Sequence, residues 1–69
     1  MRTDFSKRLY EMRTERKLSQ LALGSAAGIS QRAVYDYEAG SRYPTLKSLV
    51  GIRHALNCSW EELLGGIDL

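Results

Sequence analysis

Apolar residues recur along this chain mostly at intervals of three and four, the spacing that places side chains on one face of an α-helix. The first stretch with this spacing predicts a helix from Thr3 or Asp4 to Arg16. Its buried stripe is expected to consist of Phe5, Leu9 and Met12. Later stretches predict a short helix after Ser59 and three central helices, over residues 20–27, 31–39 and 46–56. The pattern therefore predicts an all-α fold, a compact five-helix bundle.

Residues with strong capping preferences mark the ends of the central helices. Ser19, Ser30 and Thr45 precede them, and a hydroxyl at such a position accepts a hydrogen bond from an otherwise unpaired amide. Gly28 and Gly40 follow two of these helices, where glycine tolerates the left-handed conformation that ends a helix. The boundaries of the central helices therefore do not depend on apolar spacing alone.

The helices at 20–27 and 31–39 are joined by about three residues that include a glycine, which describes a helix-turn-helix. The second helix of such a motif can lie in the major groove of DNA. The close crossing of two helices requires a small side chain in the first one, and Gly24 meets this need although alanine is the better helix former. The space between the helices is expected to be filled by Leu23, Ala27, Ile29, Val34 and Tyr37.

From about Phe5 to Leu64 the chain resembles the lambda-repressor-like, Cro and XRE helix-turn-helix proteins. The matching residues are Phe5, Arg8, Leu9, Arg13, Leu18, Ser19, Gln20, Leu23, Gly28, Ile29, Ser30, Val34, Tyr37, Glu38, Gly40, Pro44, Leu46, Leu49, Ala55, Leu56, Leu63 and Leu64. Two positions depart from the family, because Gly24 stands where alanine is usual and Leu21 where a polar residue is usual. We expect Leu21 to be either an exposed apolar residue or part of a partner contact.

Length and composition fit one small domain over residues 1–69, since 69 residues cannot fill a second core. Within it we expect the helix-turn-helix at 20–39, a last helix capped by Ser59 and Glu62, and a frayed tail at 65–69. No apolar run is long enough to span a bilayer, and no signal-peptide pattern opens the chain. The lone Cys58 agrees with a reducing cytoplasm and is expected to be a small buried hydrophobe.

The net charge of +2 says little by itself, but its distribution along the chain is uneven. Residues 1–58 carry all ten basic side chains and five acidic ones, a balance of +5 before His54 is counted. The other three acidic residues are Glu61, Glu62 and Asp68. A basic body with an acidic end is a plausible electrostatic footprint for DNA binding.

A recognition helix at Gln31–Ala39 would present its first turn, and one residue of the next, to base edges in the major groove. Gln31 is suited to a bidentate contact with adenine, and Arg32 to O6 and N7 of guanine. Ala33 could touch a thymine methyl group. Asp36 could accept from a cytosine amine or orient Arg32 from four residues on, and we favour the orienting role because a carboxylate near phosphates is unfavourable without a donor.

Other residues are candidates for contacts with the DNA backbone, which position a protein without reading sequence. Gln20 begins the first motif helix, where backbone amides and the helix dipole favour a phosphate. The resemblance implies a contact here too, and a second phosphate patch at Arg42, Tyr43 and Lys47. Tyr35 is either a phosphate contact or an exposed ring at the groove edge.

Some charged residues are assigned structural or solvated positions. The resemblance implies an ion pair between Arg13 and Glu38, the alternative being two independent solvated charges. Arg16 and Lys17 are either phosphate contacts or solvated surface, and solvated surface is favoured. The helix at 46–56 is expected to bury a broad face made of Leu46, Leu49, Val50, Ile52, Arg53 and Leu56.

The residues give little support to an enzyme. One histidine and one cysteine cannot assemble a convincing zinc site, and there is no glycine-rich phosphate loop. We therefore expect no catalytic residues, no cofactor, no metal and no small-molecule ligand. The serious alternative is a protein-interaction module, or antitoxin-like partner, that uses an apolar surface on the same fold: Leu21, Trp60, Ile67 and Leu69.

The resemblance and the candidate contacts together predict a small cytoplasmic regulator of prokaryotic or phage type that binds double-stranded DNA sequence-specifically. Repression is favoured over activation, because occupying a promoter excludes polymerase. A homodimer, at least on DNA, would place two recognition helices about 34 Å apart on a palindromic operator. The resemblance places its interface around the loop after the fourth helix and the fifth helix.

Overall fold

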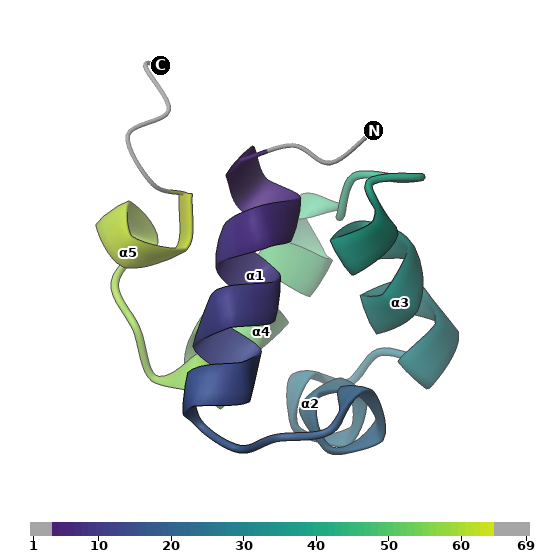
Figure 1. Cartoon of the computed structure of the whole chain (residues 1–69), viewed down its shortest axis with the longest axis horizontal. Helices are drawn as coiled ribbons and strands as arrows, with labels where there is room; N and C mark the ends of the chain where they lie inside the picture. Colours follow the sequence, from purple (N-terminus) through teal and green to yellow (C-terminus); the bar gives the residue numbers. More distant parts are fainter. Residues whose placement is uncertain (1–3, 65–69) are drawn as a thin grey trace.

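The computed structural model describes residues 4–64, which form five helices (Figure 1). In chain order they are α1 (Asp4–Glu15), α2 (Gln20–Ala27), α3 (Gln31–Ala39), α4 (Leu46–Leu56) and α5 (Trp60–Leu64). The predicted all-α five-helix fold is confirmed, and the only boundary that moves is the end of α1, one residue earlier than expected. The expected tail at 65–69, with Ile67 and Leu69, lies outside the described residues.

The predicted caps are present at the central helices. The hydroxyls of Ser19, Ser30 and Thr45 each accept a hydrogen bond from the backbone amide three residues on, at 3.0, 3.0 and 3.1 Å. Gly28 and Gly40 end α2 and α3 with φ angles of 74° and 78°. Hence the turn between α2 and α3 is fixed from both sides by local backbone chemistry.

Two helices end without a glycine. Lys17 and Asn57 adopt the left-handed conformation after α1 and α4, with φ angles of 56° and 51°. In both cases the next amide reaches back to a carbonyl near the end of the helix: Leu18 to Arg13 at 3.1 Å, and Cys58 to Arg53 at 3.3 Å. Asparagine tolerates this conformation better than lysine does.

The core lies where all five helices meet, and it contains the predicted stripe of α1. Its buried members are Phe5, Leu9, Met12, Leu23, Ala33, Val34, Tyr37, Ile52, Leu56, Cys58 and Leu63. The broad buried face expected on α4 is wrong, because Leu46 is 74 % exposed and Val50 37 % exposed. The buried part of α4 is narrower: Ile52 and Leu56 are buried, and the partly buried Leu49 continues their stripe at helical spacing.

Two glycines bring helical backbones together. A Cβ atom on Gly24 would lie 2.8 Å from the carbonyl oxygen of Ile29, so the predicted need for a small residue here is confirmed. Gly51 was not predicted to matter, yet a Cβ atom there would meet the carbonyl oxygen of Ala27. The backbones of α4 and α2 are therefore in direct contact at this point.

Two arginines tie α1 to the carboxyl ends of later helices. Arg16 donates from Nε to the carbonyl of Leu56 at 2.7 Å, and Arg8 donates from Nε to the carbonyl of Glu62 at 2.7 Å. The prediction that Arg16 is solvated surface is therefore wrong. Carbonyls at a helix end lack intrahelical partners and carry the negative end of the dipole, so they attract a guanidinium. Lys17 is exposed, as expected.

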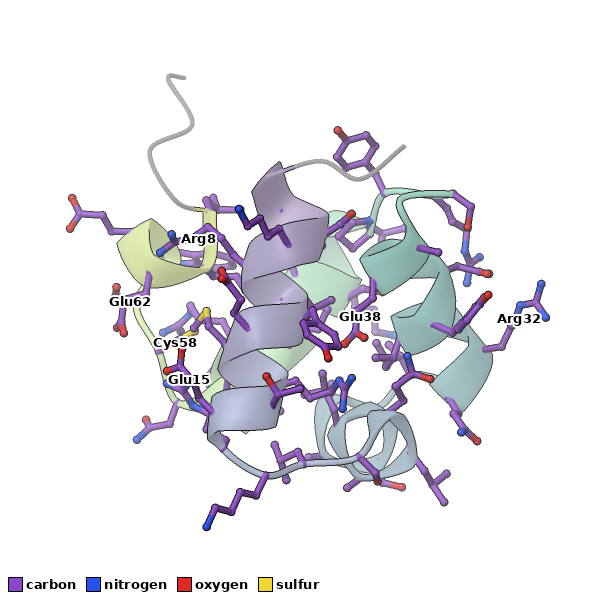
Figure 2. The ribbon with its side chains drawn as sticks, in the orientation of Figure 1. Arg8, Glu15, Arg32, Glu38, Cys58 and Glu62 are labelled. Carbon is purple, nitrogen blue, oxygen red and sulfur yellow. The ribbon has the colours of Figure 1, made fainter. Side chains whose placement is uncertain are left out.

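Cys58 is buried, as predicted, and its burial raises the pKa of the thiol. It lies on the side of the molecule that carries α5, together with Glu15 and Glu62 (Figure 2). None of the helices in the part that the structure describes is long and apolar enough to cross a membrane.

The capping box that opens α5 gives a testable pH dependence. The amide of Ser59 donates to Glu62 Oε1, and the amide of Glu62 donates to Ser59 Oγ, both at 3.0 Å. The hydrogen bonds that the Glu62 carboxylate receives from Ser59 lower its pKa below the ordinary 4.5. This contribution to folding stability is present above the unfolded-state pKa and is lost as the pH falls through the folded-state pKa.

We therefore expect wild-type protein to lose more stability than Glu62→Gln when the pH falls from the ordinary carboxyl pKa of 4.5 into the range below it. Urea unfolding followed by circular dichroism at a series of pH values measures this difference. Parallel profiles for the two proteins would show that the box does not hold the carboxylate in the folded state.

Candidate nucleic-acid interface

The start of α2 and the first turns of α3 enclose an open hollow on the surface. Its volume is about 410 Å³, and it is lined by Gln20, Gln31, Arg32 and Tyr35. Gln31 and Arg32 follow the Ser30 cap directly, so the cap fixes where the helix begins and hence which side chains its first turn presents. The structure thus brings together four of the residues that the sequence predicted to contact DNA.

The two faces of α3 differ sharply. Val34, Tyr37 and Glu38 are buried, whereas Gln31, Arg32 and Tyr35 are exposed. Figure 2 shows Arg32 projecting from α3 on the side away from α1. A helix that buries one face on the core in this way leaves the opposite face free to meet a partner.

Ala33 lies on the wrong face of α3 for the contact predicted for it. It is only 6 % exposed and belongs to the core cluster. The buried Tyr37 is four positions further along the chain, slightly more than one helical turn, so both side chains face inward. The burial of Ala33 therefore contradicts its predicted contact with a thymine methyl group.

Arg32 and Asp36 form the pair that the orienting prediction requires. Arg32 donates from Nε to Asp36 Oδ1 at 3.1 Å, one helical turn apart, and its guanidinium lies 5.5 Å from the centre of the Tyr35 ring. The Arg32 side chain is 79 % exposed, and that of Asp36 17 %. Such an exposed pair adds little stability, so its main consequence is the direction in which the guanidinium points.

A second arginine reaches the same carboxylate, which the sequence did not predict. Arg42 Nε lies 3.4 Å from Asp36 Oδ2, and its guanidinium lies 5.4 Å from the centre of the Tyr37 ring. Arg42 comes from the loop after α3, six residues beyond Asp36, so helical spacing gave no sign of this contact. The candidate base-reading arginine and a candidate phosphate-binding arginine therefore share one carboxylate.

Behind this surface, α1 and α3 are joined by the ion pair that the resemblance implied. Arg13 donates from Nε to Glu38 Oε2 at 2.6 Å and from a terminal nitrogen to Oε1 at 3.0 Å. Its other terminal nitrogen donates to the carbonyl of Leu18 at 2.7 Å. The two side chains are only 11 % and 5 % exposed, and the hydrogen bonds to Glu38 raise the pKa of Arg13. The paired arrangement is thus confirmed over independent solvated charges.

Gln20 connects the buried pair to the surface hollow. Its side-chain nitrogen donates to Glu38 Oε1 at 3.1 Å. One of its two amide hydrogens is thus committed inside the protein, which the prediction of a phosphate contact did not include. Gln20 and Tyr35 also line a second hollow of about 270 Å³, over the Arg13–Glu38 pair.

The remaining candidate contacts follow α3 in the chain. Tyr43 is 69 % exposed, and Lys47 is exposed in the first turn of α4. Tyr35 is 51 % exposed at the edge of the first hollow. Contacts of these three residues with DNA stay predictions. Among residues 4–64 the structure contains no group of three or more histidine, cysteine or acidic side chains that could hold a metal ion.

Comparisons with known proteins agree with this geometry. The family model described as Helix-turn-helix matches residues 9–63. A relative from Bacillus subtilis strain 168, the uncharacterized HTH-type transcriptional regulator YqaE, is 39 % identical over 62 residues, which is 90 % of this chain and 53 % of the relative. The HTH-type transcriptional activator BcrR of Enterococcus faecalis is 32 % identical over 66 residues, which is 96 % of this chain and 32 % of that protein. The chain thus spans about half of one relative and a third of the other.

Two solved structures are similar over nearly the whole chain. The restriction-modification controller protein C.AhdI from Aeromonas hydrophila superposes with a TM-score of 0.82 and 34 % identity, covering 86 % of this chain and 89 % of that one. The P22 c2 repressor, solved in complex with a synthetic operator, superposes with a TM-score of 0.83 and 32 % identity, covering 90 % and 94 %.

Proposed function

Because the chain belongs to the helix-turn-helix family of lambda-repressor-like, Cro and XRE proteins, we propose that it binds double-stranded operator DNA sequence-specifically as a transcriptional regulator. The observation that carries this proposal is the exposed face of α3, which presents Gln31 and Arg32 from its first turn beside the start of α2. α3 enters the major groove in this mode, and the protein performs no chemistry on the DNA.

In the proposed complex, Gln31 pairs with an adenine and Arg32 with a guanine. Arg32 already uses Nε for Asp36, which leaves its two terminal nitrogens for O6 and N7 of the base. The proposed phosphate contacts are Gln20, Tyr35, Arg42, Tyr43 and Lys47. Gln20 makes its contact with its second amide hydrogen or through the backbone at the start of α2, since Glu38 holds the first.

A single recognition helix reads only a few base pairs, so a homodimer on a palindromic operator is part of the proposal, with the two copies of α3 about 34 Å apart. Regulation follows from occupancy, and repression by exclusion of polymerase requires nothing beyond a promoter site. The same proposal places the protein in the cytoplasm, where bacterial operators are, and includes no enzymatic activity.

A second candidate function is a protein-interaction module on the same fold. The observation that favours it is the exposure of large apolar side chains outside the α3 face: Leu21 at 59 %, Leu46 at 74 % and Trp60 at 39 %. Leu21 is exposed, as both alternatives for this residue require. An interaction module does not need Gln31 and Arg32 at the groove-facing positions. DNA binding is therefore the proposal that accounts for more of the exposed residues.

Selection of bound sites from a random duplex pool tests the proposal, with Arg32→Ala and Arg42→Ala as matched variants. Arg32→Ala should weaken operator binding by about 1–3 kcal/mol and relax the preference at one base pair. Arg42→Ala, which removes the same charge, should weaken binding to operator and random DNA alike and reduce the salt slope by about 0.9.

A palindromic motif enriched by the wild-type protein would support a sequence-reading dimer. Equal losses on operator and random DNA from Arg32→Ala would overturn its base-reading role. No enrichment from a folded wild-type protein would favour the interaction module instead.

A further inference from the structure

The two oxygens of the Asp36 carboxylate contact two different arginines, one of which is proposed to bind a base and the other a phosphate. Oδ1 accepts from Nε of Arg32 at 3.1 Å, and Oδ2 lies 3.4 Å from Nε of Arg42. Asp36 is the least exposed member of the three, with 17 % of its side chain accessible against 79 % for Arg32 and 53 % for Arg42. It therefore lies between the two guanidinium groups and the helix, at the surface that meets DNA.

The geometry gives the two arginines different freedom on DNA. Arg32 can keep its Nε on Asp36 while its two terminal nitrogens bind guanine, so the base contact and the ion pair are compatible. An arginine drawn fully to a phosphate turns away from a neighbouring carboxylate. If both arginines turned to phosphates, Asp36 would stand close to DNA without a cation beside it, and like charges repel strongly at such a surface.

We propose that Asp36 is a positioning residue that sets specificity, because it weakens binding to non-operator DNA more than binding to the operator. This inference rests on the proposed DNA-binding function and names the residue that separates operator from random sequence. On an operator, guanine engages Arg32 in the orientation that Asp36 imposes, and the carboxylate stays neutralised. On random DNA no base favours that orientation, and a phosphate contact that turns Arg32 away, in addition to Arg42, leaves the Asp36 carboxylate without a cation beside it.

The test compares Asp36→Asn with wild-type protein on the selected operator and on random duplex, over a range of salt concentrations. Asparagine keeps the size of the side chain but has no charge and only one acceptor oxygen, so it cannot offer a separate charged oxygen to each arginine. One added phosphate contact should steepen the salt slope on random DNA by about 0.9, which corresponds to about eightfold tighter binding at 0.1 M salt. Operator affinity should stay about the same or fall, so the ratio of operator to random affinity should drop about eightfold or more.

Two further variants make the result interpretable. Glu15→Gln removes the same charge from an exposed position on the other side of the molecule from Arg32 (Figure 2) and should leave the ratio unchanged. Asp36→Glu keeps the charge and should retain the wild-type salt slope even if Asp36→Asn proves less stable. Thermal melting of every variant separates a change in binding from a change in folding.

An unchanged salt slope and unchanged random-DNA affinity for Asp36→Asn, with a wild-type motif still selected, would overturn this inference and leave the proposed function standing. Loss of a cytosine preference at one fixed position, with random-DNA affinity unchanged, would also overturn it, because Asp36 would then read a base directly. A wild-type protein that selects no motif would overturn the proposed function, and this inference with it.

Discussion

Replacing Gly51 by alanine is expected to lower the free energy of unfolding by about 1–3 kcal/mol. A Cβ atom at this position would meet the carbonyl oxygen of Ala27, where the backbones of α4 and α2 touch. No flexible side chain is available to move aside, so one of the two helices must shift, and overpacking of this kind costs about 1–3 kcal/mol or more. A domain of this size rarely has more than about 3–5 kcal/mol of stability, so such a loss is a large share of the total.

Helix propensity predicts the opposite sign for this substitution. Alanine is about 1 kcal/mol better than glycine inside a helix, so an α4 in isolation would be strengthened. The measurement is urea unfolding followed by circular dichroism, with His54→Ala on the same helix as the control. His54 is exposed, so its replacement should change stability by at most about 0.5 kcal/mol. A Gly51→Ala protein at least as stable as wild type would show that α4 moves away from α2 without a significant loss.

The features of the fold that depend on neighbouring residues were predictable from the sequence. Hydroxyl caps act on amides three residues away, and glycine ends a helix through its own backbone conformation, so Ser30 and Gly40 fixed the ends of α3. The need for Gly24 followed in the same way, because the crossing of α2 and α3 lies within one short motif. The helix boundaries and the turn were therefore predicted closely.

What the sequence could not show is which residues meet across long separations. Gly51 looks like a defect in a helix until Ala27 is placed against it. Arg16 looks solvated until the end of α4, forty residues later, supplies the carbonyl of Leu56. Leu46 fits the apolar pattern of α4, but no neighbouring helix covers it in the part of the chain that the structure describes. Apolar spacing predicts a face and does not say how much of that face is covered.

The candidate interface shows the same difference between features set by nearby residues and contacts between distant ones. The predictions for Gln31, Arg32 and Asp36 came from positions within α3; the structure exposes Gln31 and Arg32 and contains the Arg32–Asp36 pair. Ala33 was assigned to the wrong face because its place in the first turn was weighed without its spacing from Tyr37. The bridge to Arg42 depends on the path of a loop, which no periodicity describes.

Glu38→Ala is the second substitution with a large expected effect, a loss of about 3–5 kcal/mol in the free energy of unfolding. The Glu38 carboxylate accepts two hydrogen bonds from Arg13 and one from Gln20, and its side chain is 5 % exposed. Without it, the guanidinium of Arg13 keeps the carbonyl of Leu18 as a hydrogen-bond acceptor and the Tyr10 ring 5.5 Å away, but has no anion beside it in this largely buried site. Urea unfolding measures the loss, and Arg32→Ala, at an exposed ion pair, should change stability by less than about 1 kcal/mol.

Replacing both partners separates the stability that the ion pair contributes from the stability lost when one buried charge is left unpaired. Arg13→Met combined with Glu38→Leu removes both charges and keeps apolar volume, so it should recover most of the stability that either single variant loses. Additive losses in the double variant would contradict this, because they would mean that the two side chains are not coupled and that each stabilises the fold through other contacts. Recovery of stability would leave the pair a different role, since Gln20 would still lose the carboxylate that holds its amide at the edge of the hollow between α2 and α3. The double variant should then be stable and yet bind operator DNA more weakly than wild type, which the same duplex titration measures.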